Sequence, residues 1–121
     1  MSVANDILNG VGLWIAREER ANERDDAAIR SVLEAVNSTK RYLASLDRGE
    51  PVNRESEGTL VDLWTNASVH IRRTDLDLSV RLQEKAEYWT NPENWPGDDE
   101  AENRIQIDRI SRDARNLLKG S

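Results

Sequence analysis

The spacing of the apolar residues is the feature that most limits how this chain can fold. Apolar side chains recur every three or four residues along nearly the whole sequence, which is the period of an amphipathic α-helix. In the first half, one alternation runs through positions 7, 11, 14, 18, 21, 25, 28, 32, 36, 39, 43 and 46. With only six Gly and three Pro, a turn-rich β-sandwich or barrel is not expected. The sequence therefore predicts an all-α fold.

Breaks in this pattern divide the chain of 121 residues into the helices of one domain. The clearest break is at residues 47–51, because Gly49 suits the position after a helix and Pro51 cannot continue one. A second loop is expected at residues 91–97. The prediction is a single antiparallel bundle of four to five helices, at residues 3–22, 26–47, 54–90 and 98–119.

The polar run at residues 17–26 leaves two alternatives for the first half of the chain. It places Glu18, Ala21 and Asp25 on the otherwise apolar stripe. Either one long helix has an exposed polar waist, or the chain turns near Asn22 and a second helix is capped by an aspartate. Two helices are the favoured interpretation.

Two features of the second half are also open at this stage. A polar notch at residues 72–75 interrupts the helix predicted at 54–90, and one kinked helix is slightly favoured over two that meet near Thr74. Trp95, in the loop, is expected to fold back near Trp89 because its ring is too large to leave in water. On the last helix the buried face is expected to hold Ile107, Ile110, Ala114, Leu117 and Leu118, with Ile105 at its margin.

The composition excludes several classes of chemistry. The chain has no Cys and one His, so disulfide scaffolds, Cys-ligated zinc, thiol catalysis and sites with several histidines are ruled out. It also lacks a phosphate-binding Gly loop, a G-x-S-x-G elbow and an H-E-x-x-H motif. No catalytic residues, metal ligands or cofactor are therefore predicted.

The charge balance bears on partners and location. The net charge of −6 argues against general nucleic-acid binding, which depends on neutralising phosphates. Of the 17 basic residues only Lys40, Lys85 and Lys119 are lysines, and a GC-rich genome would produce the same excess of Arg. No signal peptide and no apolar run of membrane-spanning length is found. We expect a cytoplasmic protein without a membrane partner.

The most specific polar pattern lies in the helix predicted at 54–90. Its members recur at spacings of four and three and so share one side of a helix: Asn66, His70, Arg73, Asp77, Arg81, Glu84 and Tyr88. One interpretation is a solvated face with Arg–Asp pairs. The other is a ligand or partner surface in which arginines bind an anion and a tryptophan stacks on it. The candidate surface then consists of Trp64, Asn66, His70, Arg72, Arg73, Asp77 and Arg81.

These observations favour a small, acidic, non-catalytic helical module that binds a protein partner or a second copy of itself. A dimer is the preferred form, because the apolar stripe of the first helices needs a surface to cover it if they are extended. The alternative is a sensor or sponge for a small anionic ligand such as a nucleotide. For the tryptophans on the stripes, such as Trp14, Trp64 and Trp89, the simpler interpretation is that they fill the core in place of the absent Phe.

Overall fold

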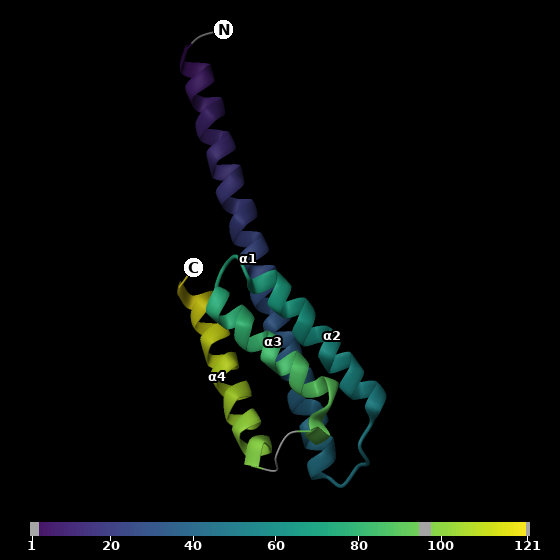
Figure 1. Cartoon of the computed structure of the whole chain (residues 1–121). Helices are drawn as coiled ribbons and strands as arrows, with labels where there is room; N and C mark the ends of the chain where they lie inside the picture. The colour runs from purple at the N-terminus through teal and green to yellow at the C-terminus, as the bar shows by residue number, and fades with distance from the viewer. Residues whose placement is uncertain (1–2, 95–97, 121) are drawn as a thin grey trace.

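The computed structural model is built from helices over the residues that it describes, as predicted (Figure 1). It describes the backbone of residues 3–94 and 98–120, and the side chains of residues 25–93 and 102–118. No strand occurs in that part of the chain. The elements are α1 (Val3–Asp47), α2 (Arg54–Ile71), α3 (Leu76–Thr90), the 3₁₀ turn η1 (Pro92–Asn94) and α4 (Asp98–Gly120).

The first half of the chain forms one helix where two were favoured. α1 runs without interruption through residues 17–26, the polar run that was expected to hold a turn. That run contains neither Gly nor Pro and is rich in Arg and Glu, which are good helix formers. Polar residues on the stripe therefore change what the helix can pack against, but they do not end it.

The helix predicted at 54–90 is instead two helices. The backbone N–H groups of Thr74 and Asp75 both donate to the carbonyl of Ile71, at 2.9 Å. The Asp75 carboxylate then caps α3 by accepting from the N–H of Leu78 at 2.9 Å. Unbroken, a helix over 54–90 would be about 55 Å long, and half of its apolar face would lie beyond the bundle. Reversal at this turn brings both halves to the same core.

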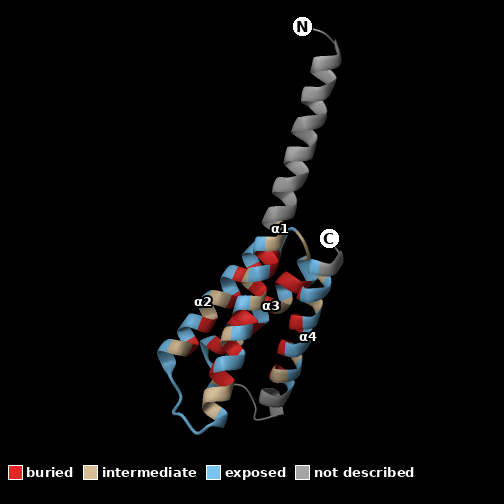
Figure 2. Ribbon diagram, turned by 180° about the vertical axis from the view of Figure 1, so that it is seen from behind, coloured by how far each residue is buried: buried red, intermediate tan, exposed pale blue. Residues whose placement is uncertain are grey.

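The core lies between the four α-helices (Figure 2). α2 and α4 both pack against α1, and α3 packs against α2. α1 buries its predicted stripe from Ala28 to Leu43, while Leu46 is partly buried. Ile29, Ala35 and Tyr42 of α1 are buried as well. Outside α1, the buried apolar residues are Leu60, Trp64, Ala67 and Ile71 of α2, Leu78, Leu82, Ala86 and Trp89 of α3, and Ile107, Ile110 and Ala114 of α4.

The ends of α4 agree with the sequence, but its buried face is shorter than predicted. Leu117 is only partly buried, and Leu118 and Ile105 are exposed. Leu118 was expected in the core and is not there. The expected position of Trp95 against Trp89 lies outside the described residues, as do the side chains of Trp14 and the first part of the stripe.

Gly49 ends α1 in a conformation that other residues adopt at a cost. Its φ is +88°, and it is the only described residue with a positive φ. The N–H of Gly49 donates to Leu46 and that of Glu50 to Ser45, at 2.9 and 3.0 Å. These bonds satisfy carbonyl groups at the end of the helix and turn the chain toward α2.

A pair of glycine substitutions tests this assignment. Gly49→Ala should lower the free energy of unfolding by about 1 kcal/mol, because the left-handed region disfavours a Cβ. Gly58→Ala, within α2, should raise it by about 1 kcal/mol through helix propensity. An added Cβ meets nothing within 4 Å at either site, so packing does not confuse the comparison. Urea unfolding followed by circular dichroism measures both, and changes of equal sign would contradict the assignment.

Candidate functional site

Trp64 belongs to the core and not to the predicted ligand surface. Its side chain is 0% exposed, and its Nε1 donates to the hydroxyl of Thr39 on α1 at 2.9 Å. Neither face of the ring is open to a ligand, so stacking on a base or nucleotide is not available to this residue. The placement corrects its inclusion in the candidate surface and agrees with the core interpretation.

The other predicted surface residues do not form one stripe, because the helix ends between them. Asn66 and His70 lie near the end of α2, while Asp77 and Arg81 lie on α3, which runs back in the opposite direction. Arg72 and Arg73 lie in the turn between the two helices and are exposed. These residues are spaced by three and four in the sequence, but they do not share one helix face because the chain reverses its direction at this turn.

Contacts of these side chains are local or structural. The Nδ1 of His70 lies 2.7 Å from the carbonyl oxygen of Asn66, one helical turn away. Arg81 is partly buried, and its Nη1 donates to the Asp113 carboxylate of α4 at 2.6 Å. Arg81 therefore joins two helices, and of the arginines predicted for the surface only Arg72 and Arg73 are exposed.

The turn between α2 and α3 marks one end of the bundle. There the hydroxyl of Thr74 donates to the Asp25 carboxylate of α1 at 2.8 Å. α1 does not end at this level: it continues to Val3, which is about 33 Å of further helix at 1.5 Å per residue. Figure 1 shows α1 passing the point where α2 and α3 meet.

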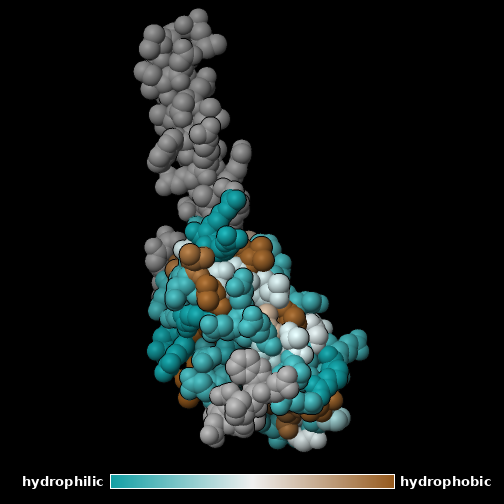
Figure 3. All heavy atoms as spheres, in the orientation of Figure 1, coloured by the Kyte–Doolittle hydropathy of each residue, from teal (hydrophilic) through white to brown (hydrophobic). Residues whose placement is uncertain are grey.

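Exposed apolar side chains lie near the same end. Val69 is in the last turns of α2, Leu76 begins α3, and Val80 follows one turn later. They are 64%, 64% and 47% exposed, among the largest values for apolar residues in the described part of the chain. Figure 3 shows hydrophobic surface at this end of the bundle. This end therefore combines a continuing helix with apolar surface that the bundle leaves in water.

A buried polar network near the opposite end was missed by the sequence analysis. The Tyr42 hydroxyl donates to the Glu57 carboxylate at 2.9 Å and accepts from the N–H of Asn53 at 3.1 Å. Glu57 is only 5% exposed, and its second carboxylate oxygen accepts from Arg54 at 2.8 Å. Arg54 also contacts Glu93. The sequence signal for the burial of Glu57 is its place on the apolar face of α2, one turn before Leu60 and two turns before Trp64.

This network perturbs the tyrosine. Burial raises the pKa of Tyr42 above its ordinary 10.0, and the hydrogen bond to the Glu57 carboxylate and its negative charge raise it further. The N–H of Asn53 and the charge of Arg54 act in the opposite direction. Tyr42 is thus held in its neutral form, as a structural hydrogen-bond donor, across the physiological range.

A second polar cluster joins α3 to α4. The ammonium of Lys85 donates to the side-chain amide oxygen of Asn103 at 2.8 Å and also to the side-chain amide oxygen of Gln106. It lies 6.0 Å from the centre of the Tyr88 ring. Lys85 and Asn103 are both buried, and a cavity opens beside them. Neither Lys85 nor Asn103 was predicted as a site residue.

Among the described residues no group of three or more His, Cys, Asp or Glu is arranged to hold a metal ion. In the same part of the chain, every helix is too short or too polar to cross a membrane. Comparisons of the chain with protein-family models, with curated proteins and with solved structures found no match.

The raised pKa of Tyr42 gives a test of the buried network. The folded protein keeps the hydroxyl proton at a pH where the unfolded chain has lost it, so this stabilisation is complete below pH 10.0 and disappears as the pH rises through the folded-state pKa. In the Tyr88→Phe variant, Tyr42 is the only tyrosine, and its tyrosinate absorbance should have a midpoint above 10.0. Equal midpoints in buffer and in denaturant would contradict the network.

Proposed function

We propose that this protein is a non-catalytic helical interaction module that associates with a second copy of itself through the first part of α1. The observation that supports this proposal is that α1 is a single helix longer than the bundle. α1 has 45 residues, whereas α2 and α3 have 18 and 15. The part of α1 from Asp25 to Asp47 is already long enough to lie beside α2 and the turns at its two ends.

The sequence of residues 3–24 continues the stripe that the bundle buries. Ala28 and Val32 are buried against the other helices, and Ile7, Val11 and Trp14 follow the same alternation of three and four along an unbroken helix. Such an alternation is the pattern of a coiled-coil seam. An apolar stripe of this length is costly in water, and soluble proteins cover such surfaces with a partner.

A second copy is the simplest cover for this stripe. Two identical stripes related by a two-fold axis bury each other without a further partner. The exposed apolar side chains of Val69, Leu76 and Val80 lie beside the point where α1 leaves the bundle, and they can widen such an interface. The proposed dimer is therefore centred on residues 3–24.

The alternative function, a sensor for a nucleotide-like anion, has less support. Trp64 is buried and Arg81 is paired with Asp113, so the proposed site loses its stacking surface and one of its cations. Arg72 and Arg73 alone, on an exposed turn, do not define a pocket. The self-associating module is the better explanation of the geometry.

A substitution on the stripe tests the proposal. Val11→Glu should lower the dimer affinity by at least about tenfold, because it places a charge in the seam. Asn9→Glu adds the same charge on the opposite side of the helix and should leave the affinity unchanged. Sedimentation equilibrium over a range of concentrations measures both. A wild-type protein that stays monomeric at the highest concentration would overturn the proposed function.

The acidic interruption of the stripe supplies a second test with the opposite sign. Glu18 occupies a position of the alternation that is apolar on either side of the polar run. Polar residues at such positions cost stability in a coiled coil. Glu18→Leu should therefore tighten the dimer by about tenfold, while Glu19→Leu, one residue away from the stripe, should have a much smaller effect. Equal effects of the two changes would mean that the stripe is not the interface.

A further inference from the structure

A hydrogen bond at the end of the bundle shows which side of α1 carries the stripe there. Asp25 is a position of the stripe, and its carboxylate accepts from the Thr74 hydroxyl of the α2–α3 turn at 2.8 Å. Ala28, the next position, is buried. Ile7 precedes Asp25 by 18 residues, which is about five turns of an unbroken α-helix, and so lies on the same side of α1. The stripe of residues 3–24 is therefore on the side of α1 that faces the space directly beyond this turn.

The bundle limits how a second α1 can cover the stripe. In a parallel pair in register, the second helix would run along residues 3–24 and continue into the space that α2 and α3 already occupy beside α1 (Figures 1 and 2). In an antiparallel pair the second helix runs the other way, so that its own bundle lies about 33 Å away, beyond the far end of the stripe. Only the antiparallel arrangement gives both bundles room.

The distribution of charge along α1 favours the same orientation. Residues 17–26 carry eight charged side chains, whereas residues 3–16 carry only that of Asp6. In a parallel pair identical positions meet, so that Glu18 would lie against Glu18 and two like charges would repel each other in the seam. In an antiparallel pair the charged part of each helix lies beside the uncharged part of the other, and Asp6 is not a position of the stripe.

The end of the bundle offers an apolar surface to a helix that arrives in this way. Leu76 and Val69 are each 64% exposed and belong to the two helices that the turn joins, and Val80 follows on α3 with 47%. In an antiparallel pair the first turns of the second α1 reach this end. Four of the six residues at positions 3–8 are apolar, which matches the surface that they would meet.

We propose that the two copies are antiparallel, and that the first turns of each α1 dock on the end of the other copy's bundle, against Leu76 and Val69. This orientation depends on the self-association proposed above and specifies its second contact. Each copy supplies one helix tip and one docking surface, and the two-fold axis makes both contacts twice. The assembly is therefore closed at two copies, with no free docking surface on which a fibre could grow.

Crosslinking of the full chain tests the orientation, and because the sequence contains no Cys, an introduced thiol is unique. Ala4→Cys and Ala21→Cys are separate variants on the stripe. In the antiparallel pair residue 4 of one copy lies near residue 21 of the other, while identical positions are about 25 Å apart. A short bismaleimide should therefore join the two variants when they are mixed and should join neither variant to itself, as mass spectrometry would show.

The other outcomes separate the orientation from the self-association. Crosslinking of each variant to itself would mean a parallel pair and would refute the proposed orientation. A protein that is dimeric in sedimentation equilibrium but forms no crosslink in the mixture would refute it as well. A protein that stays monomeric would overturn the proposed function itself.

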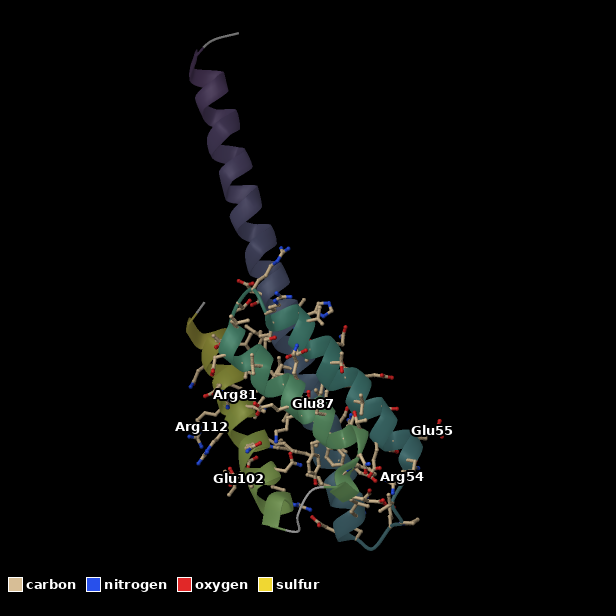
Figure 4. The ribbon with its side chains drawn as sticks, in the orientation of Figure 1. Arg54, Glu55, Arg81, Glu87, Glu102 and Arg112 are labelled. Atoms are coloured by element: carbon tan, nitrogen blue, oxygen red, sulfur yellow. The ribbon has the colours of Figure 1, made fainter. Side chains whose placement is uncertain are left out.

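A matched pair of variants tests the docking surface. Leu76→Glu should weaken the dimer by at least about tenfold, because it places a charge where the second helix docks. An acidic residue in the first turn of α3 suits the helix dipole, so the fold is retained. Val52→Glu is the control: Val52 is 57% exposed and lies two residues before Arg54, which Figure 4 labels at the opposite end of the bundle. Its dimer affinity should equal that of the wild type, and an unchanged affinity in Leu76→Glu would refute docking at this end.

Discussion

The burial of Trp64 against α1 is the contact on which the rest of the structure depends. Its indole is fully enclosed, and its one polar atom is satisfied by the hydroxyl of Thr39, which in turn donates to the carbonyl of Ala35 at 2.8 Å. A large apolar ring with a single donor sets both the depth and the rotation of α2 on α1. Because α3 packs on α2, the same contact also decides where α3 lies.

The interfaces between the helices differ in chemistry. α1 meets α2 and α4 through the apolar residues of the core, and the Lys40–Asp108 and Asp47–Arg104 ion pairs lie at its contact with α4. α3 and α4 are joined by the Arg81–Asp113 ion pair and the Lys85–Asn103 hydrogen bond. α1 itself continues past the α2–α3 turn to Val3.

Local sequence signals predicted much of the fold. The period of the apolar residues predicted helices, the buried stripe of α1 from Ala28 to Leu43 and the break at Gly49. The polar notch at residues 72–75 was recognised as a break in the pattern. One kinked helix was slightly favoured there, whereas the structure has two helices. Whether a notch kinks a helix or reverses it depends on whether the second half gains a core by turning back. That gain comes from other parts of the chain.

The sequence by itself determined the helical class, the ends of the last helix and which face of each helix is apolar. These properties are local, because a side chain three or four residues away shares a face in any helix. Only the tertiary structure decided that Trp64 turns inward, that Arg81 reaches Asp113 and that Glu57 meets Tyr42. These pairs join residues that are 25, 32 and 15 positions apart and lie in different helices. Their formation depends on how the helices are rotated and shifted against one another, which no spacing within a single helix specifies.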